Sequence, residues 1–577
     1  MKLIVRQYLA SLKERGELDA VVPDLLSQLG LIVYSRPGRG TRQDGVDVAA
    51  VGSLDGGAEK VYLFSIKPGD LTRTSWNGNV PQSLRPSLDE ILDSYIPNRL
   101  PEEHKDKKVV ICLCFGGDIQ EQVRPQVKGY IKRNKRENLT FEEWNGDKLA
   151  SLILSNFLRE DLLPPNARSQ LRKSLALLDE PEASYQHFAV LIRSLSSKES
   201  INVENQLTVI RQINICLWIL FSWARDAGNI ESAYLSSEIA LLHAWEIAKA
   251  YAAKTTNTAK EVQSAFQSIL IAYFQISTQY IGEKILPHTQ KQHSLSVAVR
   301  ASCNLDVNLK LFDVLGRLAM GGIWAYWIAK QVEEDENDRY DLCWREIDSY
   351  TIAIKQLISH NPTLLLPIKD DQAIDMSIAL LLLFIDKKNH NYIRKWLSEL
   401  IRRATFAHQI DGLYPCNLNS YAELLEHPQQ KNEVYRKEVT SGSILIPMIA
   451  LSAALLGDGD LYSNVQNIKE KHLNHCNFQF WYPDESSEEH FYTNSDAHGA
   501  TLSHTCIDRS IDEFLSQAFA ECKHTPHFKT LSAVENGLWP IILIACRHYR
   551  IPVPLHLWEG LHEPAEEALN KPLEPTR

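Results

Sequence analysis

The sequence has no hydrophobic run long enough to cross a membrane. Its longest apolar stretches are ICLWILF at residues 215–221 and IALLLLFI at residues 378–385, whereas a membrane helix needs about 20 apolar residues. Near the N-terminus, charges at Arg6, Lys13 and Glu14 interrupt any secretory apolar core. We therefore expect a soluble, cytoplasmic protein with no membrane partner.

Paired cysteines and nucleotide-binding signatures are also missing. The ten cysteines include no CxxC pair and show no regular spacing, which indicates reduced thiols rather than a disulfide framework. The sequence contains no GxxxxGK[ST] loop and no glycine-rich turn between a strand and a helix. These absences disfavour a disulfide-rich secreted protein, a P-loop NTPase and a dinucleotide-dependent enzyme.

The chain has no overall excess of positive charge. Its 61 Lys and Arg stand against 72 Asp and Glu, a formal net charge of −11, which argues against a general nucleic-acid binder. The acidity is uneven, because residues 1–160 hold 23 basic and 22 acidic residues and the remainder is therefore at −12. The first part also contains a local basic cluster, which consists of Lys128, Lys132, Arg133, Lys135 and Arg136. Such a cluster indicates either phosphate contacts or an ordinary solvated helix face.

The length and the pattern predict two parts of different kinds. With 577 residues, 44% of them hydrophobic, the chain can bury more than one core. Residues 1–165 alternate helical and strand-like patterns, which predicts an α/β sheet between helices. Residues 166–577 show helical periodicity and almost no strand signal. This predicts a large all-α module, either a helical-repeat scaffold or an irregular helical domain, which divides near residue 300 and ends in a flexible tail at 563–577.

The main candidate functional residues of the first part lie in residues 43–67, QDGVDVAAVGSLDGGAEKVYLFSIK. Two runs rich in β-branched and aromatic residues flank a DGG turn signal and predict a β-hairpin. If the hairpin closes symmetrically about Gly56, paired residue numbers add up to 112, so Asp47 lies opposite Ser65. Lys67 then shares the face of Ser65. A carboxylate and an ammonium thus converge at one end of an apolar ribbon, either as a site or as an inert ion pair at a hairpin end.

The order and spacing of these motifs resemble the restriction-endonuclease-like PD-(D/E)XK superfamily, especially its Mrr-type branch. In that branch a helix carrying an acidic residue ends at Leu-Gly, here residues 29–30. A loop similar to D-G-x-D, here residues 44–47, then enters a hairpin that ends in Q-x-K or E-x-K, here residues 65–67. The strand, turn and helix around residues 144–149 are also similar to the end of Mrr-type domains. The resemblance covers about a quarter of the chain and implies an αβββαβ core.

The resemblance implies a DNA endonuclease that depends on Mg²⁺ or Mn²⁺. Asp47 would be the principal metal ligand, and the Ile66 carbonyl would assist it. The acidic residue of the helix falls on Asp19, with Glu17 as the nearest substitute. Lys67 would orient the attacking water or stabilise the transition state.

Ser65 is the departure from the family pattern, because the family usually has Glu, Asp or Gln at this position. A hydroxyl is a weaker metal ligand, so two functions stay open: an active endonuclease, or an inactive nuclease-like fold that acts as a scaffold for DNA or protein. RNA is a third possible substrate. Nuclease domains fused to large helical regions look like bacterial defence effectors against phage or foreign DNA. For the helical module this implies a partner protein or a second copy of the chain.

Basic side chains of the first part are the candidate DNA contacts. They are Arg36, Arg39 and Arg42 in the loop before the hairpin, and Lys128, Lys132 and Arg133 in the basic cluster. Lysine and arginine neutralise phosphate charge. We therefore expect the first part, rather than the acidic module, to hold DNA.

Possible metal ligands lie close together in one segment of the helical module. Its members are His472, His475, Cys476, His490, His498, His504 and Cys506. His472 and His475 are three residues apart, so both could face one ion, but no second pair follows at zinc-finger spacing. Loop histidines, or a pocket that recognises a ligand or partner, are therefore the favoured interpretation.

Overall fold

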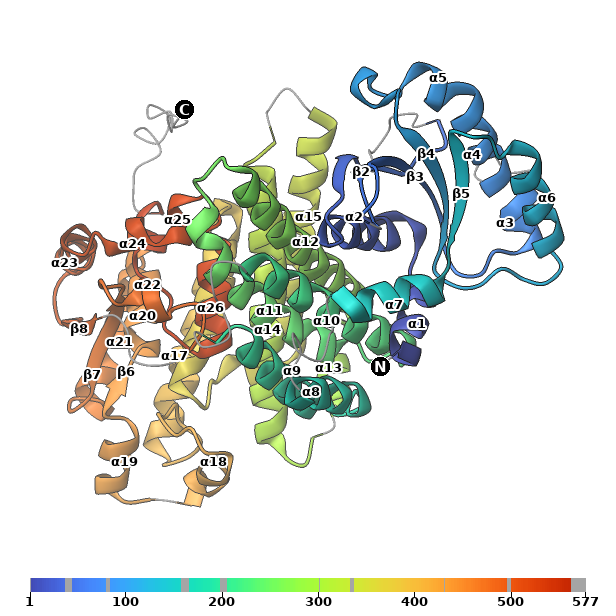
Figure 1. Ribbon diagram of the computed structural model, residues 1–577. Coiled ribbons are helices and arrows are strands. Elements are labelled where there is room, and N and C mark those ends of the chain that lie inside the picture. Colours follow the sequence, from blue (N-terminus) through green and yellow to red (C-terminus); the bar gives the residue numbers. More distant parts are fainter. Residues whose placement is uncertain are drawn as a thin grey trace. The chain divides into compact units, whose positions relative to one another are not determined.

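The chain divides into two compact units, Met1–Ile276 and Ser277–Arg577. The computed structural model (Figure 1) describes residues 2–36, 44–54, 56–78, 83–156, 165–197, 205–299, 301–332, 337–429, 431–494 and 500–561. Residue 165, where the sequence predicts a change from sheet to helices, lies inside the first unit. There α8 (Pro165–Ala176) follows the sheet region.

A five-stranded mixed sheet forms the centre of the first unit. In spatial order its strands are β1 (Ile32–Ser35), β2 (Val48–Gly52), β3 (Lys60–Lys67), β4 (Lys108–Phe115) and β5 (Leu139–Trp144). β1 to β3 are antiparallel neighbours, whereas β3, β4 and β5 run parallel. The register pairs Val48 with Phe64, and these numbers add up to 112 as predicted. An N-terminal α/β region is thereby confirmed.

Helices cover both faces of this sheet (Figure 1). One face packs against α3 (Arg73–Asn77), α4 (Leu84–Glu90) and α6 (Arg124–Asn134); the other packs against α1 (Lys2–Ser11), α2 (Asp19–Gln28) and α7 (Gly146–Asn156). The central strands β3 and β4 are buried along nearly their whole length, which explains their unbroken apolar runs.

The helix that follows α3 begins before Pro86. It starts at Leu84 after Ser83, and it continues through a π-helical turn, η2 (Ile91–Tyr95). Pro86 therefore lies in the first turn, where its missing N–H has no intrahelical partner to lose.

The rest of the first unit is helical. After α8 follow α9 (Pro181–Leu195), α10 (Gln206–Asp226), α11 (Glu231–Ala248) and α12 (Asn257–Tyr280), which reaches the second unit. Among the residues that the structure describes, only α10 is long and apolar enough to cross a membrane, and 83% of its apolar window is buried inside the protein. The short run at 215–221 thus belongs to a 21-residue helix that packs as a core helix.

The second unit is largely helical. Its longer helices are α14 (Asn304–Ala329), α15 (Asn337–His360), α16 (Ala373–Phe384), α17 (His390–Gln409), α20 (Leu445–Leu455), α21 (Gly459–His472), α23 (Ile511–His524) and α26 (Pro540–Tyr549). It also contains a three-stranded sheet of β6 (Gly442–Ser443), β7 (Asn477–Tyr482) and β8 (Ala500–His504). The prediction of an all-α module is therefore wrong here. The aromatic run NFQFWY forms β7, in keeping with the preference of aromatic residues for strands.

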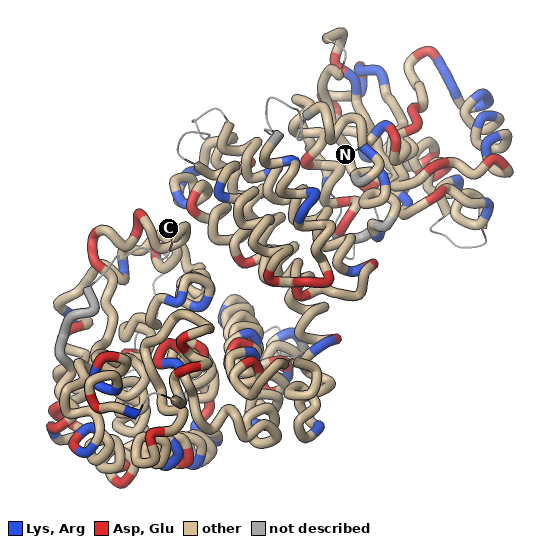
Figure 2. Tube along the Cα trace, turned by 90° about the horizontal axis from the view of Figure 1, so that it is seen from below, with Lys and Arg blue, Asp and Glu red and all other residues tan. Residues whose placement is uncertain are grey.

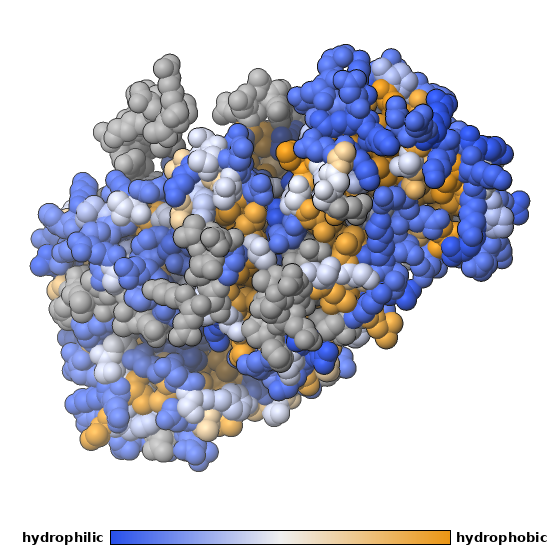
Figure 3. All heavy atoms as spheres, viewed as in Figure 1, coloured by the Kyte–Doolittle hydropathy of each residue, from blue (hydrophilic) through white to orange (hydrophobic). Residues whose placement is uncertain are grey.

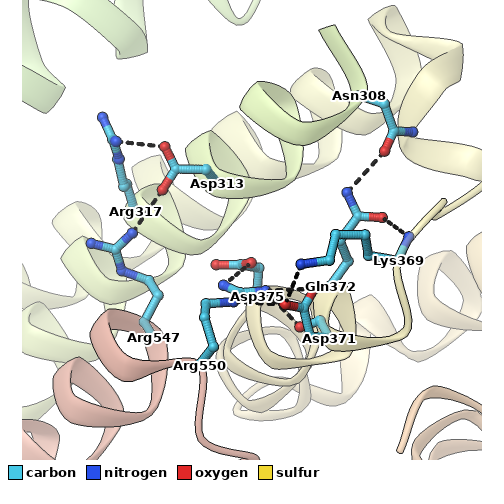
Figure 4. Close-up of polar contacts among 9 residues, drawn as sticks. All are labelled: Asn308, Asp313, Arg317, Lys369, Asp371, Gln372, Asp375, Arg547 and Arg550. Carbon is cyan, nitrogen blue, oxygen red and sulfur yellow. Dashed lines mark hydrogen bonds and ion pairs between the residues drawn. The ribbon is translucent and has the colours of Figure 1, made fainter. Parts of the chain in front are cut away.

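Ion pairs between buried and partly exposed side chains join three helices of the second unit (Figure 4). Asp313 of α14 lies between two guanidinium groups, 2.5 Å from Arg317 and 2.9 Å from Arg547 of α26. Arg550, just after α26, lies 2.8 Å from Asp375 of α16. The side chains of Arg317 and Arg547 are only 2% and 4% exposed. These ion pairs fix α26 against α14 and α16.

Two of the histidines noted in the sequence, His472 and His475, lie in different surroundings. His472, at the end of α21, stacks on His408 of α17, with ring centroids 5.7 Å apart. The His475 Nε2 atom lies 2.9 Å from the Thr440 hydroxyl, and His498 lies outside the described residues. Burial lowers the pKa of His408 to about 3, so this ring is neutral in the stack. His472 and His475 thus have separate partners.

Candidate active site at the end of the hairpin

Three segments meet at the C-terminal end of β3. They are the loop before β2, the last residues of β3, and a π-helical turn, η1 (Glu14–Leu18), between α1 and α2. π-Helical turns are rare and often occur at functional sites. Asp47, Lys67 and Glu14 come one from each of these segments.

Asp47 is held by the backbone of β3. Its Oδ2 atom accepts a hydrogen bond from the Ile66 N–H at 2.7 Å, and its own N–H donates to the Phe64 carbonyl at 2.8 Å. Burial raises the pKa of Asp47 to about 6, although the Ile66 bond and Lys67 act in the opposite direction. A buried carboxylate with a raised pKa, beside a specific cation, is typical of functional sites.

Lys67 is paired with an acidic residue that the sequence reasoning missed. Its Nζ atom lies 3.2 Å from Glu14 Oε1, and its side chain is 7% exposed. Glu14 and Asp19 both act to raise the pKa of Asp47. Asp19 thus lies close enough to Asp47 to influence its charge, and Glu14 is an additional carboxylate. Counting back along a regular helix could not find Glu14, because a π-helical turn shifts the register of the residues before it.

Glu17 does not take the place of Asp19. Its Oε1 atom lies 2.9 Å from Arg225 of α10, and its Oε2 atom accepts a hydrogen bond from the Lys13 N–H at 2.8 Å. Glu17 is therefore bound to the helical segment and to its own turn. Its interpretation as a substitute for the acidic residue of the site is not supported by these contacts.

Ser65 is enclosed within the sheet. It is 0% exposed, and its hydroxyl makes no hydrogen bond with any residue that the structure describes. Neither Asp47 nor Lys67 bonds to it. Ser65 therefore adds a small buried hydroxyl to the site and no charge.

The side chains of the site are of the type that binds a hard metal ion, but no three of them in the described ranges are placed to share one ion. The carboxylates of Asp47, Asp19 and Glu14 are oxygen donors of the type that Mg²⁺ and Mn²⁺ prefer. However, within the described ranges no three His, Cys, Asp or Glu side chains are placed to share one ion. Asp47 Oδ2 is bonded to the Ile66 N–H, and Glu14 Oε1 to Lys67. The ligand set of Asp47, Asp19 and the Ile66 carbonyl therefore stays a prediction, and no chemical step is assigned to a metal here.

The loop that leads to Asp47 depends on two left-handed residues. Asp44 has φ 46° and its carboxylate lies 2.6 Å from the Arg99 guanidinium. Gly45 has φ +81°, and a Cβ atom there would lie 2.0 Å from the carbonyl oxygen of Ser87. Aspartate and glycine are among the few residues that adopt this conformation readily. The D-G dipeptide therefore has a structural role: it aims the chain into the hairpin.

We expect Gly45→Ala to destabilise the first unit strongly. Gly56, in the hairpin turn, is the matched control because it also has a positive φ of +67°, but a Cβ atom there would have no other atom within 4 Å. Gly56→Ala should cost about 1–2 kcal/mol, the usual penalty for a left-handed alanine. Gly45→Ala should cost at least twice as much, because the Ser87 carbonyl must also move. Urea unfolding of both variants measures the difference, and equal costs would show that the close contact is unimportant.

The basic cluster of α6 lies on the surface. Lys128, Lys132 and Arg133 are exposed. Figure 2 shows Lys and Arg segments gathered at the right, where α6 lies, and Figure 3 shows a mainly hydrophilic surface there. Arg36 is also exposed, whereas Arg39 and Arg42 lie outside the described residues.

This cluster and Lys67 lie near opposite ends of the parallel strands. Arg136, just after α6, forms a bridge with Leu139 at the start of β5. Lys67 pairs with Phe115 at the end of β4. The strand rise of about 3.3 Å per residue separates the two ends by roughly 20 Å. A duplex that touches both must therefore run along the sheet region.

Comparison with known proteins finds no match for this chain among family models, curated proteins or solved structures. The function is therefore inferred from the residues of the site.

Proposed function

We propose that the N-terminal region is a restriction-endonuclease-like PD-(D/E)XK nuclease, which hydrolyses phosphodiester bonds in DNA with Mg²⁺ or Mn²⁺ as cofactor. One observation carries the proposal: a half-buried carboxylate, Asp47, interacts with a buried ammonium, Lys67, at the end of a hairpin that continues into parallel strands. The motif order and the topology both agree with the αβββαβ core that the resemblance implies.

Each residue has a role that its surroundings favour. Lys67 is a compact positive charge, which stabilises negative charge that develops on the phosphoryl oxygens. Asp47, with a pKa of about 6, is ionised near neutral pH and still basic enough to accept a proton from an attacking water. The ionised form is costly in this buried position, which is the usual condition of a catalytic base.

The remainder of the chain is proposed to bind protein. Its net charge of −12 repels a phosphate backbone across any broad shared surface. DNA would then be held by Arg36, Arg39, Arg42 and the basic cluster. A role as a cytoplasmic effector of bacterial defence, with a partner protein or a second copy on the helical part, is part of this proposal.

A nuclease-like scaffold without activity is the second candidate. It is favoured by the ion pair between the Glu14 carboxylate and Lys67, at 3.2 Å, and by the uncharged Ser65. Such a protein would bind DNA or protein through the same surface and would leave phosphodiester bonds intact.

The experiment that separates the two candidates uses the full-length protein. It is incubated with supercoiled plasmid, and in parallel with a folded RNA, in Mg²⁺, in Mn²⁺ and in chelator. We expect nicked or linear plasmid with either metal and none in chelator. Retarded but uncut plasmid would establish the scaffold, and cleavage of RNA alone would change the substrate.

A further inference from the structure

One helix, α10, bonds to both ends of the segment that carries the π-helical turn. Near its start, Arg211 donates to the Gln28 side chain at the end of α2, at 2.9 Å. In its last turn, Arg225 lies 2.9 Å from Glu17. The two arginines are 14 positions apart, about 21 Å along a helix. α10 thus spans α2 and the turn η1 and is bonded to each.

The bond at the turn is almost fully enclosed. The side chains of Arg225 and Glu17 are 16% and 6% exposed, and the Arg225 guanidinium lies over the Phe221 ring, 5.4 Å from its centroid. Glu17 also accepts a hydrogen bond from the Lys13 N–H. One carboxylate therefore closes its own turn and ties that turn to α10.

The same turn sets the position of Glu14. The Leu18 N–H bonds to the Lys13 carbonyl at 3.0 Å, five residues back, as in a π-helix. This wide turn presents Glu14 to Lys67 and Glu17 to Arg225. A relaxation of the turn toward the common α-helical spacing would rotate Glu14 relative to Glu17. The Glu14–Lys67 contact therefore depends on what holds Glu17.

We infer that Arg225 is a positioning residue that holds the nuclease-like site in a resting arrangement. Acting through Glu17, it keeps the π-helical turn closed, so that Glu14 neutralises Lys67. Release of Arg225 by a movement of α10 frees Glu14 and Lys67 together. The expected effect on cleavage rests on the proposed function, but the restraint that Arg225 places on the turn can be measured separately.

A purely structural ion pair is the competing explanation. Removal of one partner of a buried pair destabilises a protein whatever its role, so loss of stability alone decides nothing. If the pair holds a resting arrangement, its removal must have a different effect. The turn must then open locally while the rest of the first unit stays folded, and DNA cleavage must become faster.

The test is amide hydrogen exchange of residues 13–18 in the full-length protein. We expect Arg225→Gln and Glu17→Gln each to speed exchange there by about tenfold, as for loss of one local bond. The double variant should add little, because both changes remove one interaction. Arg225→Lys, which keeps the charge, should stay near wild type. Arg211→Gln is the matched control, since it removes a buried arginine of the same helix without touching the turn.

Plasmid cleavage by the same proteins completes the test. Faster exchange together with faster cleavage in Arg225→Gln supports the inference. Unchanged exchange at residues 13–18 overturns it, and so does faster exchange with slower cleavage, because the turn would then be part of the active arrangement. If exchange responds as expected and no protein cuts DNA, wild type included, the hold on the turn stands and the proposed nuclease function fails. Should Arg225→Gln not fold, Glu17→Gln and Arg225→Lys give the same comparison.

Discussion

Asp47→Asn is expected to abolish DNA cleavage and, at the same time, to stabilise the N-terminal region. Cleavage should fall by about 10³-fold or more, the loss typical for removal of a key charged group from an active site. The gain in stability follows from the pKa of about 6, which lies above the unfolded value near 3.9. The folded state therefore binds the proton more tightly, and the ionised carboxylate weakens the fold as the pH rises through about 6.

The size and the pH dependence of this gain can be stated. Replacement of the carboxylate should add about 3 kcal/mol at pH 8, and the gain should nearly vanish at about pH 3, where both states hold the proton. Urea unfolding in metal-free buffer at the two pH values measures it. Asp93→Asn, at an exposed position, is the control and should change neither stability nor cleavage. An Asp47→Asn variant that is less stable at pH 8 and cuts normally would refute the assignment of Asp47.

Asp313→Ala is expected to destabilise the second unit strongly. The substitution removes the carboxylate that lies between Arg317 and Arg547, whose side chains are 2% and 4% exposed. Two buried guanidinium groups would then face each other without the anion between them. Removal of one partner from such a buried pair costs on the order of 3 kcal/mol or more.

The control for Asp313→Ala is an exposed ion pair of the same unit. Asp348 and Lys388 lie 2.9 Å apart, but their side chains are 52% and 55% exposed. Asp348→Ala should cost less than about 1 kcal/mol, because water screens the pair. The unfolding midpoints of the two variants, compared with wild type, measure the difference. Similar costs for both would show that the buried network contributes no more than a surface pair.

Local patterns of the sequence predicted the sheet region well. The DGG turn and the alternating apolar residues fix the hairpin register, so the pairing of Val48 with Phe64 follows from counting alone. The juxtaposition of Asp47 and Lys67 follows from the same register, because side chains alternate strictly along a strand.

Contacts between distant segments could not be predicted in this way. Arg225 and Glu17 are 208 positions apart, and neither local sequence indicates that the two residues are in contact. Glu14 was missed because a π-helical turn breaks the regular spacing used for counting. The short strand β7 was missed because the helices around it dominate the pattern. Such features depend on packing between elements, which one sequence does not display.

The most direct test of the proposed nuclease is cleavage of supercoiled plasmid by the full-length wild-type protein beside Lys67→Ala, in Mg²⁺ or Mn²⁺. If Lys67 stabilises the charge of the transition state, wild type should nick or linearise the plasmid. Lys67→Ala should then leave the plasmid supercoiled over the same time while still retarding it on a gel. Equal cleavage by both proteins, or cleavage by neither, would contradict the account.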